Sequence, residues 1–239
     1  MPAESVVTQG DAVHMLDPRA AHAAEVQLPA TVDALMRQVN GLRRSQRRSP
    51  VAEQAALGAA AREFAAFLAR TGRFAHDADG RQPADRAQQH GYAYCIISEN
   101  IAYEERRPEF SSDELAGRLF EGWRNSPPHL HNMLEPDVTE TGIGLARSAG
   151  GRWFAVQLFG LPKSAETIFA ITNRTARTVH YRLGDHDLEL LPRVTRTHHE
   201  CGAPTLMIGD GPTATEMTVR SGEAIGVVQG PAGLRVERE

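Results

Sequence analysis

The sequence of 239 residues has almost no lysine and few cysteines. Lys163 is the single lysine among 26 basic residues, and Cys95 and Cys201 are the only two thiols. Two distant cysteines cannot form a disulfide framework, and no Cys-x-x-Cys pair is present to indicate redox chemistry or a zinc site. One bridge between the two halves of the chain stays open. Because mixed polar and apolar residues flank both positions, the sequence favours two separate, buried thiols.

Long apolar runs and a strong net charge are also missing. No stretch approaches the roughly 20 apolar residues that a membrane-spanning helix needs. The formal net charge is −4, from 26 basic and 30 acidic residues, which gives no long-range attraction for nucleic acid or anionic lipid. The basic run from Arg43 to Arg48 has no aromatic neighbours, so we interpret it as a solvated helix end and loop. We therefore expect no nucleic-acid partner and no transmembrane segment.

The N-terminal residues 1–28 show no lasting periodicity and predict a poorly ordered leader. They lack the basic start and the continuous apolar centre of a secretory signal, because Asp11, Asp17 and Arg19 interrupt the segment. No signal peptide is therefore visible. Either the protein is cytoplasmic, or the sequence starts after a leader that has been removed.

Residues 29–162 predict a domain of the α+β class. Apolar residues at helical spacing begin at Thr31 and recur between residues 52 and 69, and Pro83 suits the first turn of a short helix. Ser111 with Glu114 forms a capping box that starts another helix, which we expect Pro127-Pro128 to end. Residues 94–97 read as a short strand. Residues 142–146 and 153–159 alternate with a period of two and predict an antiparallel hairpin, so the helices are expected to pack against an antiparallel sheet.

Residues 163–239 predict a second, all-β domain, a small sandwich or barrel. Short strand-like runs are separated by Gly, Pro, Asp or Asn, at residues 168–172, 178–183, 188–191, 205–208, 216–219, 224–228 and 234–236. Several histidines and acids lie in this region without the spacing of a known metal site, and we interpret them as turn and surface residues: His180, Asp185, His186, Asp187, His198 and His199.

Four segments combine residues that carry chemistry. They are residues 74–86 with His76, residues 98–102 with Glu99, residues 123–134, and residues 139–144. Taken singly, each has an ordinary structural explanation as a loop, cap or helix end. Taken together and in this order, they resemble the bacterial members of the CAP superfamily of cysteine-rich secretory, antigen five and pathogenesis-related proteins. Those members show Phe-x-His, Glu-Asn-Ile, Ser-Pro-x-His followed by Asn-x-Leu, and Glu-x-Gly-x-Gly segments, and the resemblance covers about residues 31–161.

The resemblance implies an α-β-α sandwich with a polar cleft that holds two histidines and two acidic residues. His76, Glu99 and His129 match three of these positions. Ser126 stands where eukaryotic members carry the second acid, and Asn132 stands where many carry a glutamine. Glu140 and Glu121 are two candidates to replace the missing acid, and the sequence places neither of them in the cleft. The resemblance also implies an extracellular or periplasmic location.

These residues support three hypotheses about function. The first is a protein that binds a small molecule, lipid, peptide or wall component in the cleft, with zinc or another divalent cation held by His76 and His129. The second is a metal-assisted hydrolase with Glu99 as the catalytic base. The third is a structural or interaction module with a vestigial cleft. The resemblance favours the first, because family members are credited with sterol, lipid or metal binding and with secretion. The sequence has no His-Glu-x-x-His and no Gly-x-Ser-x-Gly motif. We expect no nucleotide or organic cofactor.

Overall fold

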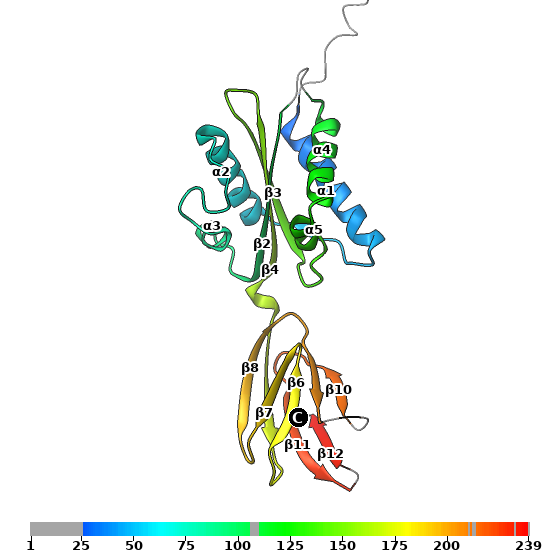
Figure 1. The fold of residues 1–239 in the computed structure, drawn as a ribbon. Helices are drawn as coiled ribbons and strands as arrows, with labels where there is room; N and C mark the ends of the chain where they lie inside the picture. Colours follow the sequence, from blue (N-terminus) through cyan, green and yellow to red (C-terminus); the bar gives the residue numbers. More distant parts are fainter. Residues whose placement is uncertain (1–25, 106–109, 210, 212–213, 232, 239) are drawn as a thin grey trace, which may run out of the picture.

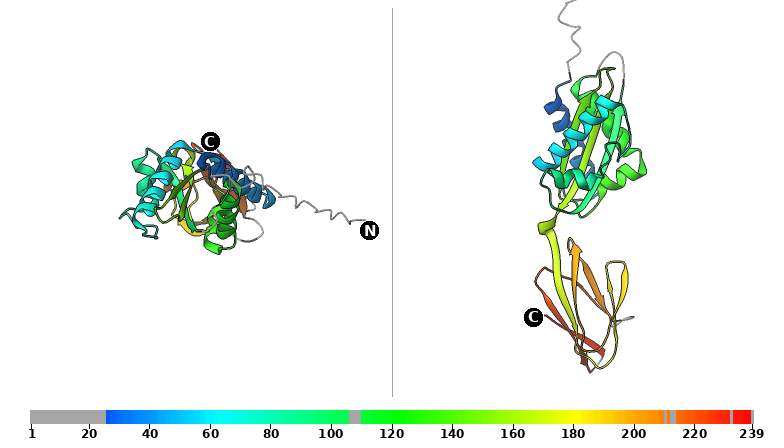
Figure 2. Two further views of the ribbon diagram at one scale, coloured as in Figure 1. Left: turned by 90° about the horizontal axis from the view of Figure 1, so that it is seen from above. Right: turned by 90° about the vertical axis from the view of Figure 1, so that its left-hand side faces the viewer.

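The computed structural model describes residues 26–105, 110–209, 211, 214–231 and 233–238. Nearly all of the predicted leader lies outside the described residues. Two parts lie end to end (Figures 1 and 2): a mixed helix and sheet part over residues 26–162, here the N-terminal part, and an all-β part over residues 163–238, here the C-terminal part. The exact domain boundaries stay a prediction.

The N-terminal part is a four-stranded sheet between two layers of helices. The strand order is β1-β3-β4-β2, antiparallel except for a short parallel pairing of β1 with β3. Helices α2 and α3 cover one face, and α1, α4 and α5 cover the other (Figure 1). This confirms the predicted α-β-α sandwich. The elements are α1 (Leu28–Ser45), β1 (Ala52–Glu53), α2 (Ala55–Thr71), α3 (Pro83–Gln89), β2 (Tyr94–Glu104), α4 (Ser112–Arg124), α5 (Pro127–Leu134), β3 (Glu140–Arg147) and β4 (Trp153–Pro162).

Local sequence signals explain several helix ends. The Ser111 hydroxyl accepts a bond from the Glu114 backbone N–H, and the Glu114 carboxylate accepts one from the Ser111 N–H, which confirms the capping box of α4. Helix α2 ends at Gly72, whose φ of 70° is left-handed and suits glycine. Helix α3 begins at Pro83, as expected.

Two local features were missed. Helix α4 ends at Arg124, before Pro127-Pro128, as expected. The two prolines also begin a further helix, α5, because a proline in the first turn lacks an N–H that would have no helical partner. Strand β2 runs to Glu104 instead of ending at Ile97. It therefore includes Glu99 and Asn100, which places both on an edge strand of the sheet.

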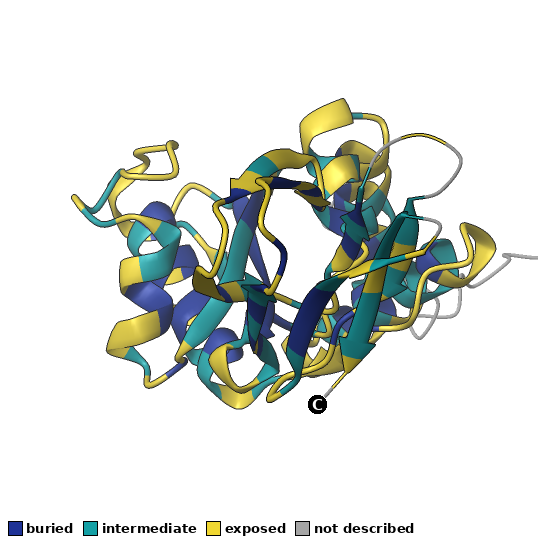
Figure 3. Ribbon diagram, turned by 90° about the horizontal axis from the view of Figure 1, so that it is seen from below, coloured by how far each residue is buried: buried dark blue, intermediate teal, exposed yellow. Residues whose placement is uncertain are grey.

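Glycines let α2 lie directly on β3. A Cβ atom at Gly142 would lie 2.1 Å from the backbone N of Gly58, and one at Gly144 would lie 2.2 Å from the backbone of Ala61. Such distances exclude any side chain at these two positions. The core fills both sides of the sheet, one cluster with α1 and α4 and one with α2. Seen from below, buried residues gather between the layers and exposed residues cover the outside (Figure 3).

The C-terminal part is a sandwich of two four-stranded sheets and contains no closed barrel among the described residues. The strand orders are β10-β9-β6-β7 and β12-β11-β5-β8, around a core of apolar residues from both sheets. After the short 3-10 helix η1 (Lys163–Ala165), the strands are β5 (Glu166–Asn173), β6 (Val179–Leu183), β7 (His186–Leu190), β8 (Thr195–Cys201), β9 (Thr205–Ile208), β10 (Thr215–Thr218), β11 (Ala224–Gly230) and β12 (Gly233–Arg238).

Cys95 and Cys201 form a disulfide bridge, so the expectation of separate thiols was wrong. Strand register explains why they meet. In β2, Tyr94 pairs with Pro162 at the end of β4, and in β8, Cys201 pairs with Glu166 at the start of β5. Both cysteines therefore flank the η1 linker, and their Cα atoms are 5.6 Å apart. The bridge gives the two parts a second covalent connection.

None of the helices in the described ranges is long and apolar enough to span a membrane.

Candidate functional site

The first half of the site is a pair formed by His76 and Glu99. His76 lies in the loop between α2 and α3, and its Nδ1 lies 2.8 Å from Oε1 of Glu99 on β2. Because a carboxylate only accepts, Nδ1 carries the proton and Nε2 remains at the surface. The side chain of His76 is 50% exposed, whereas that of Glu99 is 1% exposed. The pair therefore presents an oriented imidazole above a buried carboxylate.

Arg86 of α3 neutralises the buried carboxylate. Its guanidinium donates to Oε2 of Glu99 and to Oδ1 of Asp79, both at 2.8 Å. It also donates to the backbone carbonyls of His76 and Arg81, which fixes the loop that carries the histidine. Its Cζ lies 3.6 Å from the ring centroid of Phe64. A buried anion needs such a partner, so Arg86 is the residue that lets Glu99 stay charged inside the protein.

The second half of the site comes from α5, on the other side of β2. Asn100 donates from Nδ2 to the backbone carbonyl of His129, at 3.1 Å. Asn132 donates from Nδ2 to the backbone carbonyl of Glu99 and to Oδ1 of Asn100. Successive strand residues face opposite sides, so Glu99 faces α3 and Asn100 faces α5. The site thus straddles the edge strand β2, with one histidine from each helical layer.

The two imidazoles have opposite tendencies toward protonation. The hydrogen bond with Glu99 raises the pKa of His76 above its usual value near 6.5, and burial only partly opposes this. Burial lowers the pKa of His129, and the nearby His76 lowers it further. The site therefore combines one histidine whose pKa is raised by a carboxylate with one whose pKa is lowered by burial.

Two residues expected in the cleft do not join this group. Ser126 precedes α5, its side chain makes no capping bond, and no described contact links its hydroxyl with the His129 ring. Glu140 accepts a 2.6 Å hydrogen bond from the hydroxyl of Tyr92. It lies on β3, which the central strand β4 separates from β2. Glu140 therefore does not replace the missing acid beside the histidines.

The described residues contain no group of three or more His, Cys, Asp or Glu side chains that could hold a metal ion. Both oxygens of Glu99 already have partners, so the metal-ligating atoms that remain in the site are those of the two imidazoles. Three protein ligands are usual in a catalytic zinc site. The two imidazoles of His76 and His129 therefore fit a divalent cation only if water or a bound ligand molecule supplies the remaining coordination positions.

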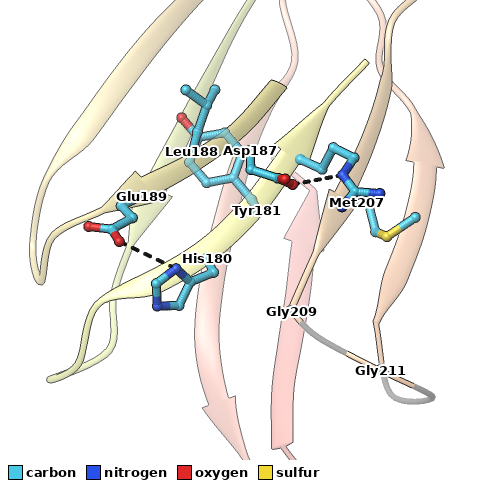
Figure 4. A pocket seen from close by; sticks show the side chains of 9 residues that line it. His180, Tyr181, Asp187, Leu188, Glu189, Met207, Gly209 and Gly211 are labelled. Atoms are coloured by element: carbon cyan, nitrogen blue, oxygen red, sulfur yellow. Dashed lines mark hydrogen bonds and ion pairs between the residues drawn. The ribbon is translucent and has the colours of Figure 1, made fainter. Parts of the chain in front are cut away.

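A separate hollow of about 570 Å³ lies on the C-terminal part, and none of the site residues lines it. Figure 4 shows His180 and Glu189 pointing toward each other on its wall, with their ring nitrogen and carboxylate 3.7 Å apart. Asp187 pairs with Arg182 at 2.7 Å. These are exposed pairs between neighbouring strands, which agrees with the interpretation of His180 and Asp187 as surface residues. For His198 that interpretation was wrong, because its ring is buried, with Nε2 2.9 Å from the hydroxyl of Tyr181.

The sequence profile of the cysteine-rich secretory protein (CAP) family matches residues 36–159. The chain belongs to this family.

Three solved structures are similar to part of this chain. An outer surface protein from Borrelia burgdorferi is 19% identical, with a TM-score of 0.51, over 57% of this chain and 96% of that one. An extracellular protein containing an SCP domain from Bacillus anthracis is 22% identical, with a TM-score of 0.45, over 55% of this chain and 40% of that one. A cysteine-rich secretory protein from Staphylococcus aureus is 20% identical, with a TM-score of 0.42, over 55% and 39%. No curated protein matches the chain.

In this CAP protein, sequence reasoning missed Arg86 and Asp79. Both lie within the Phe-x-His segment, but neither belongs to its recognised pattern. One signal was available in the sequence. Glu99 stands in an apolar run with Ile101 and Ala102, which indicates that its carboxylate is buried, and a buried carboxylate needs a cation as partner. Helix α3 offers Arg86 beside Ala87, and these two are its buried residues.

Proposed function

We propose that this CAP protein is a binding protein whose ligand contacts His76 and His129 at the edge of β2. One observation carries the proposal: two imidazoles with opposite protonation tendencies flank the same strand. The protonated ring of His76 donates from Nε2 to an oxygen of the ligand. The neutral ring of His129 offers a lone pair to a hydrogen-bond donor or to a cation.

We further propose that zinc or another divalent cation binds there together with the ligand. Neutral imidazole is a good ligand for such ions, and a carboxylate bound to the other ring nitrogen orients a ligating histidine. His76 has that arrangement through Glu99. A cation bound to Nε2 of His76 would displace the proton that this nitrogen donates to the ligand in the metal-free site, so metal binding would release a proton. When bound, the cation would supply a positive contact for a ligand oxygen. Two protein donors predict weak binding that depends on the ligand.

The environment of Glu99 favours binding over hydrolysis. Its Oε1 accepts from His76 and its Oε2 from Arg86, and its side chain is only 1% exposed, so both oxygens face protein donors and not a substrate water. A general base must reach that proton within hydrogen-bond distance. The metal-assisted hydrolase therefore lacks its base, whereas the binding protein needs Glu99 only as a positioning residue.

Titration of the purified chain with Zn²⁺ tests the proposal. Imidazole NMR resonances of His76 and His129 should shift together, and His76→Ala or His129→Ala should abolish the shift of the other ring. His131→Ala is the matched control, because its side chain is 76% exposed on the same helix α5. Zinc binding that is unchanged in the double variant would refute the metal site. Turnover of ester, peptide or phosphate substrates that disappears in Glu99→Gln would favour the hydrolase.

We propose an extracellular or periplasmic location for this chain. The matched family is one of secretory proteins, and two of the similar structures are described as an outer surface protein and an extracellular protein. The Cys95–Cys201 bridge supports this location, because disulfides persist in oxidising compartments and are rare in the cytosol. Thiol labelling without reductant after cell fractionation tests it: an exported chain should be unlabelled.

A further inference from the structure

Two exposed aromatic rings stand close to the histidine site. Phe74 is 42% exposed and Tyr103 is 47% exposed. Their centroids are 5.0 Å apart with the ring planes at 87°, and the buried ring of Phe154 lies behind both at 6.3 and 6.0 Å. Large aromatic side chains usually bury most of their surface, so a supported pair that remains half exposed indicates a contact surface.

Polar groups beside these rings neutralise one another. Arg152 lies over the ring of Tyr103, with its Cζ 4.7 Å from the centroid. The guanidinium of Arg152 also donates to the Glu105 carboxylate at 3.1 Å. A hollow of about 160 Å³ opens next to them, and Phe154 and Arg152 form part of its wall. Among the described residues that contact the rings, the surface therefore offers ring faces and one hydrogen-bonding pair, Arg152 with Glu105, whose charges cancel.

This combination favours a neutral, polyhydroxylated ligand. The C–H faces of a sugar ring pack on aromatic faces, and its hydroxyls bond to planar groups such as guanidinium and carboxylate. An anionic ligand would have to compete with Glu105 for Arg152, and a lipid chain would remove water from the Arg152–Glu105 pair without replacing its hydrogen bonds. The volume of the hollow suits a single ring.

The aromatic pair and the histidine site share two structural elements. Phe74 lies two residues before His76 in the same loop, and Tyr103 lies four residues after Glu99 on β2. Glu99 and Tyr103 face the same side of that strand, at a separation of about 13 Å for four residues. A ligand that touches both places must be a chain of several rings.

We propose that Phe74, Tyr103 and Arg152 form a glycan-binding surface, and that a longer glycan extends from it along β2 to His76. Only the second clause rests on the proposed function. The first concerns residues outside the histidine site and stands without it.

Titration with neutral oligosaccharides tests the proposal. The probes are the mono- and tetrasaccharides of β-linked N-acetylglucosamine and of glucose, added to the full chain and followed by NMR. We expect Phe74→Ala and Tyr103→Ala to weaken tetrasaccharide binding about tenfold or more. Tyr103→Phe keeps the ring and should bind as the unsubstituted chain does. Leu191→Ala is the control, because Leu191 is a 58% exposed apolar residue of the C-terminal part.

The outcomes separate the two clauses. Tetrasaccharide binding that weakens in His76→Ala, with monosaccharide binding unchanged, supports a ligand that spans both places. Binding that His76→Ala leaves unchanged restricts the glycan to the aromatic surface and overturns the second clause alone. The proposal is overturned if neither tetrasaccharide binds. It is also overturned if Phe74→Ala and Tyr103→Ala bind the tetrasaccharide as tightly as the unsubstituted chain does. Binding to phosphatidylglycerol vesicles that the ring variants lose would also overturn it, in favour of a lipid surface.

Discussion

At the scale of single residues, the most constrained group is the buried Arg86 with its two carboxylates. The side chains of Arg86, Glu99 and Asp79 are 1%, 1% and 3% exposed. Removing the cation leaves the buried Oε2 of Glu99 without its donor and leaves Asp79 with Arg81 as its remaining cation. Such a loss inside the protein costs far more than the loss of a surface ion pair. The arrangement makes Arg86 a positioning residue for His76, because its bonds hold both the carboxylate and the loop.

We expect Arg86→Met to lower the free energy of unfolding by about 3–5 kcal/mol. Urea denaturation checks this value. Arg118→Met is the control, since Arg118 is 67% exposed and lies 3.6 Å from Glu104, a surface pair of about 1 kcal/mol or less. Equal effects of the two substitutions would contradict a structural role for the buried network.

The pH dependence of His76 follows from its bond to Glu99. Its pKa is raised in the folded protein, so its contribution to stability is fully present below pH 6.5, its usual pKa. That contribution is lost as the pH rises through the raised value. Glu99→Gln removes the charge and should return the pKa of His76 toward 6.5, as followed by NMR titration. An unchanged His76 pKa in Glu99→Gln would show that another group sets it.

At the scale of secondary structure elements, the contact between α2 and β3 depends on glycine. Gly144→Ala would place a methyl group inside the helix backbone, so α2 must move away from the sheet. We expect a loss of about 1–3 kcal/mol or more, measured by thermal unfolding. Gly150→Ala is the matched control, because a Cβ there meets only the Ser148 hydroxyl at 3.9 Å. Equal melting temperatures for both variants would contradict this packing.

The elements also show what the sequence could and could not predict. Apolar periodicity and the Ser111 capping box predicted α1, α2 and α4, because one stripe of each helix is buried. Strand β8 was missed because most of its residues are exposed and polar. The site residues His76, Glu99 and His129 were found by resemblance, since no periodic pattern marks them. Arg86 was missed because its role depends on a partner distant in sequence.

At the scale of the whole molecule, the Cys95–Cys201 bridge and the η1 linker hold the two parts together. Other contacts at the junction include the hydrogen bond that the Lys163 backbone N–H donates to the Ala93 carbonyl, at 2.9 Å, and the approach of Gly202 to the Asp137 carboxylate. A bridge across 106 residues restricts the unfolded chain, and such bridges contribute about 2–4 kcal/mol.

We expect the Cys95→Ser, Cys201→Ser double variant to unfold at lower urea concentration and to have a larger maximum dimension by small-angle X-ray scattering. Losing the second connection frees the C-terminal part to turn about the linker. The single variant Cys95→Ser should show the same two changes as the double variant, because it also lacks the bridge. A scattering profile identical to that of the bridged protein would show that the linker alone fixes the arrangement.

The cystine makes residues 95–201 a closed covalent ring that contains the η1 linker. A protease that cuts the backbone at Lys163 therefore cannot release either part. The nicked molecule would migrate as one species until a reductant is added, and only then as two fragments. Outside the cell, where proteases are abundant and thiols scarce, such a ring would let the β sandwich and the histidine-bearing sandwich survive cleavage as one molecule.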